Sequence, residues 1–545
     1  MSTTLLRGGR VYSSVDPFAT ALVIDEGVIA WVGSDAAAKA HAESVDEVIE
    51  LDGALVTPAF VDAHVHTTST GLMLTGLDLS TTTSASHLLD QVTAYVQSHR
   101  APVVLGHGWD ETAWTSAALP TRNELDRAAF GAPVYLSRVD VHSCLASSAL
   151  VAAAPECKAL PGFDESGWLR QGAHHAVRSA AFDAVTPQLR RAAQRAALQQ
   201  ALSLGIGTIH ELGGPQISGR SDFTELMTLE DPQRPRIVGY WGEGIGPDTA
   251  LSLNATGAAG DYFIDGAIGS RTALLVNPYS DDESTAGAQY LTAAQMRDHI
   301  AACSVRGVQA GFHVIGDGAM ELLAAAFVDA EAQVGTDVVR AAAHRLEHVE
   351  MVTQEQIELF ARLGITVSAQ PVFDQWWGGQ GGMYEKRLGA ERAPTLNPFA
   401  AMLAAGVPLA FGSDAPVTPL APWQAIRAAA HHHTPTHAIS VRAAFAAHTR
   451  GGWRAGGSTQ GGVIAPDEPA DLAVWHVDEL VVQAPDTRVA AWSTDPRSGV
   501  PPLPSVEPDA ALPECLRTMV KGLTVYNAHP AHDRASDDKG QGEIS

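Results

Sequence analysis

The stretch VTPAFVDAHVH, residues 56–66, decides how the rest of the chain is interpreted. It is mostly apolar up to Val61 and ends in His64-Val65-His66. Because alternate side chains of a β-strand point to the same face, His64 and His66 would leave one face together and could bind one metal ion. A His-x-His pair by itself packs more often than it binds a metal. The chain must therefore supply further ligands and a scaffold that gathers them.

Composition narrows the classes of function. The chain has 545 residues, of which 46% are apolar and 18% charged, as expected for one large folded domain plus a smaller one. Its 35 basic and 61 acidic residues give a net charge of −26, which argues against nucleic acid or an anionic membrane surface as the partner. No apolar run reaches the ~18 residues that a membrane-spanning helix needs.

The four cysteines do not suggest a structural role. Cys144, Cys157, Cys303 and Cys515 are widely scattered and form no Cys-x-x-Cys pair, so a Cys-rich zinc site and a disulfide framework are both unsupported. The first residues show no secretory signal pattern. This usage fits a reducing compartment, and we expect a cytoplasmic protein.

Eight apolar runs that end in polar residues alternate with Ala-rich helical segments. This βαβα order is typical of a parallel sheet, and eight such units predict a (β/α)8 TIM barrel over residues 59–459. Catalytic residues of such barrels lie at the carboxyl ends of the strands. The predicted strands are AFVDAHVH (59–66), IGTIHE (206–211), PRIVGYW (235–241), DYFIDG (261–266), VQAGFHV (308–314), HRLEHV (344–349), TVSAQP (366–371) and PLAFGSD (408–414).

The two chain ends share a strand-and-turn character. Residues 1–58 are too few to bury a core alone, and residues 460–530 supply strands of the same kind. We therefore predict one composite β-sandwich domain built from both ends. The polar segment 531–545 is predicted to be a disordered tail.

A long segment, at about residues 72–185, separates the first two predicted strands. We interpret it as an insert after the first barrel strand that lies over the barrel mouth. Its polar and aromatic residues could line a substrate pocket or only stabilise the insert, and both alternatives stay open. These residues are Trp109, Asp110, Trp114, Asp140 and His142.

Four histidines and one aspartate end separate predicted strands, which packing alone does not easily explain. His64 and His66 end the first, His313 the fifth, His348 the sixth and Asp414 the eighth. Imidazole and carboxylate are ligands of divalent zinc, iron or manganese, with zinc as the first choice. A divalent ion lowers the pKa of water toward neutrality, and Asp414 is placed to act as general acid and base. The set predicts metal-dependent hydrolysis.

Six motifs carry a family resemblance. PAFVDAHVH, DGAIGSRTALL, HVIGDGAM, HRLEHVE, LAFGSDAPV and PADLAVW occur in this order over nearly the whole chain. Together they resemble the amidohydrolase superfamily, most closely its N-substituted formamide deformylase (YtcJ-like) branch. The resemblance implies one metal bound by His64, His66 and Asp414, and His313 and His348 as ligands of a second ion where one is present. It also places Asp265 and Arg271 near the pocket and implies a homodimer.

One position departs from the family pattern. Asp261, in GDYFIDG, stands where relatives often carry a Lys that can be carboxylated and bridge two metals. An Asp side chain is much shorter, so we expect it to be a poor bridge, although Asp265 or Glu211 could serve instead. The prediction therefore favours one tightly held ion over two.

Three further residues have alternative interpretations. Gln370, at the end of the seventh predicted strand, could donate a hydrogen bond to a substrate oxygen. Arg271 could bind an anionic group of the substrate or offset nearby acidic charge. Glu347, beside His348, is expected to pack or to form a supporting hydrogen bond rather than to act in catalysis.

Together these features predict an enzyme that hydrolyses a carbon–nitrogen bond other than a peptide bond. The substrate would be a small-molecule amide, formamide or cyclic amide. Two alternatives stay open: the same metal site could hydrolyse an ester or lactone or isomerise its substrate, and the chain could be a metal-free scaffold. The sequence has no Walker-type phosphate loop and no Gly-x-Ser-x-Gly elbow.

Overall fold

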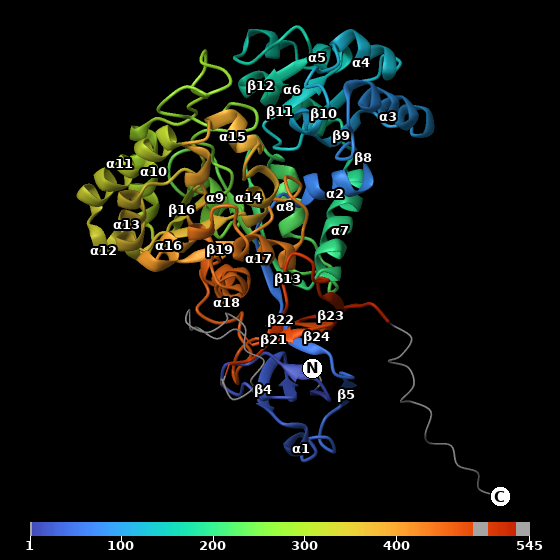
Figure 1. Ribbon diagram of the computed structural model, residues 1–545, viewed down its shortest axis with the longest axis vertical. Helices are drawn as coiled ribbons and strands as arrows, with labels where there is room; N and C mark the ends of the chain where they lie inside the picture. The colour runs from blue at the N-terminus through green and yellow to red at the C-terminus, as the bar shows by residue number, and fades with distance from the viewer. Residues whose placement is uncertain (1–2, 483–499, 530–545) are drawn as a thin grey trace, which may run out of the picture.

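A parallel eight-stranded sheet forms the centre of the computed structural model, which describes residues 3–482 and 500–529 (Figure 1). Neighbouring strands follow chain order, and a parallel bridge between Val65 and Ala415 joins the first strand to the segment after the last. The predicted (β/α)8 TIM barrel is therefore confirmed. Its strands are β7 (Phe60–Val65), β13 (Ile206–Gly213), β14 (Arg236–Trp241), β15 (Gly257–Ala258), β16 (Gln309–Val314), β17 (Arg345–His348), β18 (Thr366–Ala369) and β19 (Leu409–Phe411).

Amphipathic helices cover the outside of the barrel. In α13, Ile357, Phe360 and Leu363 recur at helical spacing and are buried, a Thr353 capping box begins the helix, and Gly364 ends it in the left-handed conformation. The helices of the barrel domain include α13 itself and its neighbours: α2 (Thr67–Thr75), α7 (Pro187–Ser203), α8 (Arg220–Met227), α9 (Asp248–Ser252), α10 (Ala293–Val305), α11 (Asp317–Val334), α12 (Thr336–Ala341), α13 (Gln354–Leu363), α14 (Pro371–Trp377), α15 (Met383–Leu388), α16 (Phe399–Ala405), α17 (Pro422–Ala430), α18 (Val441–Ala446) and α19 (Gly452–Ala455).

The prediction for the fourth strand is wrong. β15 contains only Gly257–Ala258, and residues 261–266 follow it as irregular chain with a single bridge between Phe263 and His313. Gly260 causes the early end: its φ is +109°, and a Cβ there would lie 2.4 Å from the carbonyl oxygen of Gly213. Asp261 consequently stands directly after the strand end, where barrel enzymes place functional groups.

The segment between β7 and α7 forms a separate sheet above the carboxyl ends of the barrel strands (Figure 1). Its strand order is β12-β11-β10-β9-β8, and it has its own apolar cores. The elements are β8 (Leu77–Asp78), α3 (Ala85–Ser98), β9 (Val104–Trp109), α4 (Arg122–Ala128), β10 (Val134–Arg138), β11 (Ser143–Ala146), α5 (Ser148–Ala153), β12 (Trp168–Arg170) and α6 (Gln171–Asp183).

Strands from both chain ends pair with one another. One sheet has the order β2-β6-β20-β23-β24 and a second the order β4-β3-β1-β5, with a shared apolar cluster between them. The predicted disordered tail, residues 531–545, lies outside the described residues. The strands are β1 (Thr4–Arg7), β2 (Arg10–Val11), β3 (Ala21–Asp25), β4 (Val28–Gly33), β5 (Glu47–Glu50), β6 (Leu55–Pro58), β20 (Leu472–His476), β23 (Glu514–Val520) and β24 (Leu523–Asn527).

Two further observations bear on the sequence-based expectations. In the part of the chain that the structure describes, no helix combines the length and apolar character that a membrane span requires. All four cysteines are buried free thiols.

Candidate metal centre

The predicted ligands meet at the carboxyl ends of the barrel strands. His64 and His66 stand at the end of β7, His313 lies in β16, His348 ends β17, and Asp414 follows β19. Each side chain is buried. His348 and Asp414 have φ values of 72° and 56°, a conformation that non-glycine residues adopt only where the surrounding structure enforces it. The backbone thus fixes two of the five side chains.

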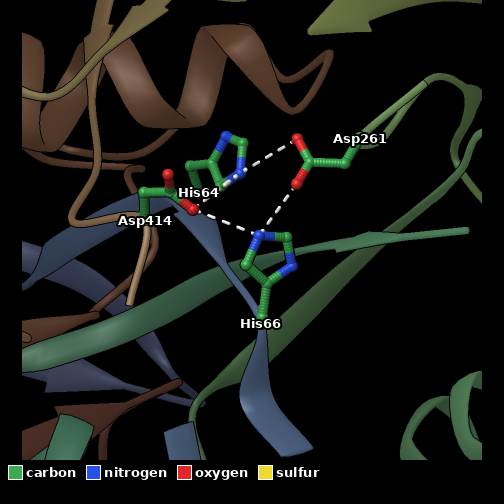
Figure 2. A group of neighbouring side chains, drawn as sticks. All are labelled: His64, His66, Asp261 and Asp414. Atoms are coloured by element: carbon green, nitrogen blue, oxygen red, sulfur yellow. Dashed lines mark ion pairs between the residues drawn. The ribbon is translucent and has the colours of Figure 1, made fainter. Parts of the chain in front are cut away.

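The first group consists of His64, His66, Asp261 and Asp414 (Figure 2). Asp414 Oδ1 lies 3.2 Å from His64 Nε2 and 3.1 Å from His66 Nε2. Asp261 faces the same two atoms from the opposite side, with Oδ1 3.4 Å from His64 Nε2 and Oδ2 3.0 Å from His66 Nε2. Two imidazoles and two carboxylates therefore converge on one small volume.

The second group consists of Asp261, His313 and His348, whose ligand atoms lie within 4.8 Å of one another. Asp261 Oδ1 is 3.6 Å from His313 Nδ1. Asp261 therefore belongs to both groups. The sequence suggested that Asp261 would be a poor bridge because its side chain is short. Its carboxylate lies within both groups because the chain bends at Gly260 and brings residue 261 over the barrel mouth.

Hydrogen bonds orient the four imidazoles. The Nδ1–H groups of three of them donate to fixed acceptors: His64 to Glu347 Oε2 (2.9 Å), His66 to the carbonyl of Leu212 (3.0 Å) and His348 to Gln370 Oε1 (2.8 Å). His313 instead donates from Nε2 to the carbonyl of Gly266, at 3.2 Å. Each ring therefore turns its unprotonated nitrogen toward the centre, as metal-binding histidines do.

The imidazole nitrogens and carboxylate oxygens that face the centre have no hydrogen-bond partner among the described residues. Several of these atoms lie at ion-pair distances from one another, but without the geometry of a hydrogen bond. Buried polar atoms without partners are rare in folded proteins, and a site for a bound ion is one accepted explanation. Nitrogen and oxygen donors without thiolates fit a divalent zinc, iron or manganese ion. The atoms are His64 Nε2, His66 Nε2, His313 Nδ1, His348 Nε2, Asp261 Oδ1 and Asp414 Oδ1.

Electrostatics favour a cation at this place. Burial lowers the pKa of His66, but Asp261 and Asp414 outweigh it and raise the pKa to about 9. The same two carboxylates raise the pKa of His64 well above its ordinary value, so they favour positive charge at these two nitrogens, and a divalent ion would take the place of the protons there. Burial, with His313 beside it, lowers the pKa of His348 to about 3, so that this ring is neutral, as a ligand must be.

Three predicted substrate residues make contacts that stabilise the surrounding structure. Asp265 accepts hydrogen bonds from the backbone N–H groups of Gly316 (2.8 Å), Leu274 (2.9 Å) and Ile315 (3.1 Å), and so fixes the loop after β16. Arg271 pairs with Asp281 through two nitrogens at 3.1 and 2.8 Å. Trp109 is fully buried in the core of the insert, where its indole N–H donates to the carbonyl of Leu136.

Two other predicted residues do belong to the site. His142 lines a cavity whose lining also includes His313, His348 and Asp414. Its ring centroid is 5.1 Å from that of His313, and burial lowers its pKa well below the ordinary value. Gln370 positions His348 through its Oε1, while its Nε2 is buried without a hydrogen-bond partner among the described residues.

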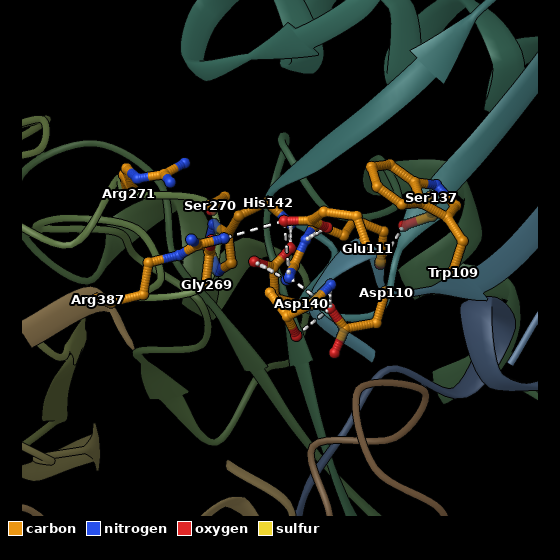
Figure 3. A network of polar contacts seen from close by, with 12 residues as sticks. Trp109, Asp110, Glu111, Ser137, Asp140, His142, Gly269, Ser270, Arg271 and Arg387 are labelled. Carbon is orange, nitrogen blue, oxygen red and sulfur yellow. Dashed lines mark hydrogen bonds and ion pairs between the residues drawn. The ribbon is translucent and has the colours of Figure 1, made fainter. Parts of the chain in front are cut away.

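The insert and the barrel loops are joined beside this cavity by a network of buried charges (Figure 3). Arg138 donates to Asp110, Glu111 and Asp140, each at 2.8 Å. Glu111 also accepts from Arg387 of α15, at 2.9 Å. Asp110 and Asp140 therefore hold Arg138 within the insert, Glu111 links the network to α15, and Asp140 also lines the cavity.

Several residues of the site were not identified from the sequence. Glu350 lines the cavity and accepts a hydrogen bond from Tyr384; burial raises its pKa to about 7. Its place two residues after His348 was the available signal. Phe373 and Trp377, whose ring centroids are 4.8 Å apart, form an aromatic wall, and they come from a helix that carries no motif.

Comparison with known proteins agrees with this architecture. A family model described as the amidohydrolase family matches residues 47–526, so the chain belongs to that family. Together with the fold and the buried ligand set, this membership defines the class of protein as a metal-dependent hydrolase.

Individual relatives give finer comparisons. The chain is 28% identical to the putative amidohydrolase YtcJ of Bacillus subtilis over 466 residues, 77% of this chain and 82% of the relative. It is 25% identical to the N-substituted formamide deformylase of Arthrobacter pascens over 529 residues, 87% and 94% of the two chains. Among solved structures it resembles an uncharacterized metal-dependent hydrolase from Pyrococcus furiosus, with a TM-score of 0.68, 26% identity, and coverage of 87% and 98%. These relatives support the YtcJ-like branch.

Proposed function

We propose that the protein hydrolyses a carbon–nitrogen bond, other than a peptide bond, in a small-molecule amide or formamide. One observation carries the proposal: unpartnered imidazole nitrogens and carboxylate oxygens converge at the carboxyl ends of the barrel strands, three of their residues line a cavity, and Asp261 is shared by both ligand groups. A protein that served only as a scaffold would have no need of such a costly arrangement.

His64, His66 and Asp414 would hold one ion, His313 and His348 a second, with Asp261 between them. A bound divalent ion would supply Lewis acidity and ionisation of water near neutral pH. Asp414 lines the cavity, so its carboxylate can take a proton from the attacking water and return it to the leaving nitrogen. The neutral His142 faces the cavity from the insert and is placed to donate a hydrogen bond to the substrate carbonyl oxygen.

The walls of the cavity support a substrate with an apolar substituent. Phe373, Trp377, Met383 and Val417 line it and are buried. Such a wall excludes water and contacts an aromatic or branched aliphatic group. The name of the Arthrobacter pascens relative, an N-substituted formamide deformylase, supports an N-substituted formamide as the first substrate to test.

Ester or lactone hydrolysis is the second candidate, because Asp414 and the Lewis acidity that a divalent ion would supply could serve a C–O bond equally well. A substrate panel separates the two. We expect N-benzylformamide or N-benzylacetamide to be cleaved faster than the matched benzyl esters after correction for their spontaneous hydrolysis. The cytoplasmic location and the homodimer stay predictions from the sequence.

The test combines elemental analysis with these assays on the parent, on Asp414→Asn and on a control, Asp329→Asn, whose carboxylate is exposed on α11. We expect bound divalent metal in the parent, loss of activity by at least about 100-fold in Asp414→Asn, and parental activity in the control. A parent without metal, or an Asp414→Asn variant as active as the parent, would contradict the proposal.

A further inference from the structure

A second cavity lies on the other side of the insert–barrel boundary. It is bounded by α2, the insert strands β9 and β10, and α6. Figure 1 shows α2 between the insert and α7. None of its lining residues lines the cavity over the metal ligands.

The guanidinium of Arg178 lines this cavity without an anionic partner. Arg178, on α6, is only 4% exposed. Within residues 3–482 and 500–529, no carboxylate forms an ion pair with it and no acceptor receives a hydrogen bond from it; its one ring contact places it 5.5 Å from the centroid of Phe182. The other deeply buried arginines of the barrel and insert among the described residues each have a carboxylate partner. They are Arg138, Arg345 and Arg387.

The neighbours of Arg178 do not neutralise it. The groups that interact electrostatically with it are His107, Tyr135, Cys144, His174 and His175. Burial first, and Arg178 second, lowers the pKa of His175 to about 4, so this ring is neutral at pH 7. An isolated buried cation is unfavourable unless a counter-charge or solvent reaches it. The cavity therefore has a positive potential at one wall.

A second unpartnered group belongs to a residue that lines the same cavity. Ser69, on α2, is that residue, and its buried hydroxyl has no hydrogen-bond partner among the described residues. A guanidinium and a hydroxyl that share a cavity match the oxygens of a carboxylate or phosphate, because the guanidinium presents parallel N–H donors. The rest of the lining is largely apolar and includes Leu72, Met73, Leu105 and Phe182.

We propose that this cavity is a second small-molecule site, which binds an organic carboxylate with an apolar body through Arg178 and Ser69. The carboxylate accepts from the guanidinium and the hydroxyl, and the apolar body packs against Leu72 and Phe182. A compact inorganic anion would satisfy the charge and leave the apolar walls uncovered. The proposal concerns binding alone and does not depend on the reaction catalysed at the metal centre.

The location connects this site with the catalytic cavity. Val141 lines the Arg178 cavity, while its neighbours Asp140 and His142 line the catalytic one. In the same way, Pro416 lines the Arg178 cavity and its neighbour Val417 lines the catalytic one. His107, which also lines the Arg178 cavity, donates from Nε2 to the carbonyl of Pro416 at 2.9 Å. A ligand beside Arg178 therefore contacts the back of two segments that carry catalytic side chains. We expect its binding to change KM for the amide substrate.

The test is calorimetric titration of the metal-loaded protein with hexanoate, hexanamide and inorganic phosphate. Arg178→Met keeps the apolar stem and removes the charge, and Arg195→Met, at an exposed position on α7, is the matched control. We expect hexanoate to bind the parent and the control, hexanamide and phosphate to bind at least about 10-fold more weakly, and Arg178→Met to lose at least about 10-fold in hexanoate affinity. Carboxylate that binds only at the metals would be unaffected by Arg178→Met.

Three results would overturn the proposal. They are an absence of hexanoate binding to the parent, equal affinity in Arg178→Met, and phosphate that binds as tightly as hexanoate. Thermal unfolding without ligand provides an independent measurement. We expect Arg178→Met to unfold at the parental temperature or above, because it removes an unpaired buried charge. A clear decrease would show that Arg178 has a structural role, which also contradicts the proposal.

Discussion

The Nδ1–H of His64 donates to the carboxylate of Glu347 across 2.9 Å, and both side chains are fully buried. Arg345 holds the same carboxylate from the other side, at 2.6 Å from Oε1 and 3.0 Å from Oε2. Burial raises the pKa of Glu347, but Arg345 and His64 outweigh it and bring the pKa to about 2. The charged carboxylate thus fixes the tautomer of His64 and turns its Nε2 toward Asp261 and Asp414.

Replacement of this carboxylate should weaken metal binding without removing a ligand. In Glu347→Gln the buried charge of Arg345 loses its partner and His64 loses a charged acceptor. Because substitutions behind metal ligands typically cost 10- to 100-fold in affinity, we expect a decrease of about that size, measured by competition with a chelator. Glu355→Gln, at an exposed position on α13, should retain parental affinity. Unchanged affinity in Glu347→Gln would show that His64 is oriented by other contacts.

Asp261 should determine how many ions the protein holds. Its carboxylate is the one group that contacts both ligand sets. We expect the parent to hold about two equivalents of divalent metal, and Asp261→Asn to hold about one after dialysis, since His313 and His348 would keep no carboxylate ligand. Elemental analysis measures this directly, with Asp329→Asn as control. Two tightly held equivalents in Asp261→Asn would contradict a bridging role.

The salt-bridge network between the insert and the barrel should stabilise the closed cavity. In Arg387→Met, Glu111 loses the cation that α15 provides, and a buried ion pair that loses one partner typically costs about 3–5 kcal/mol. We expect a lower unfolding temperature, faster proteolysis within the insert and a higher KM.

An exposed ion pair provides the matched comparison for that substitution. Arg306, whose side chain is 54% exposed, pairs with Asp248 at 3.1 Å. Arg306→Met should change stability by no more than about 1 kcal/mol, because solvent screens such pairs. Equal effects of the two substitutions would show that the network contributes no more than a surface contact.

The sequence identifies the ligands more reliably than the groups around them. His64, His66, His313, His348 and Asp414 could be predicted because each ends an apolar run, and a barrel brings such ends together. Asp261 was placed inside a strand because the apolar residues Tyr262, Phe263 and Ile264 follow it. The two-residue strand that precedes it, Gly257–Ala258, has no recognisable pattern. The bend at Gly260, which gives Asp261 its role, depends on contact with Gly213.

Long-range pairing explains why two of the predicted substrate residues make structural contacts that the sequence does not reveal. Arg271 lies in a glycine-containing loop and could be interpreted as an anion-binding group, but its partner Asp281 lies ten residues away in irregular chain. Trp109 ends strand β9, and β9 pairs with β10. The side chain of Trp109 is consequently buried in the core of the insert. Neither the pairing of Arg271 with Asp281 nor the burial of Trp109 produces a periodic pattern in the sequence. Glu347, by contrast, could be assigned a supporting role because it neighbours the predicted ligand His348.

A buried histidine outside the metal centre should make stability depend on pH. His344 Nδ1 accepts from the backbone N–H of Ala310 at 2.9 Å, and its Nε2–H donates to Ser304 Oγ at 2.8 Å. Ser304 in turn donates to the carbonyl of Ile300, so the network defines one neutral tautomer. Burial, followed by the effect of His299, lowers the pKa of His344 to about 3 from its ordinary value of 6.5. Protonation would break the bond from Ala310.

The sign of the effect follows from that lowered pKa. Below pH 6.5 the unfolded chain binds a proton that the folded protein does not, so the contribution of His344 to stability is complete above pH 6.5 and decreases as the pH falls toward 3. His344→Gln cannot titrate. We expect it to be less stable than the parent at pH 7.5, and the difference to shrink by about 2 kcal/mol at pH 5. Urea unfolding followed by tryptophan fluorescence measures both differences, with His476→Gln, at an exposed position, as the control. A difference for His344→Gln that stays constant between the two pH values would mean that His344 titrates alike in the folded and unfolded states.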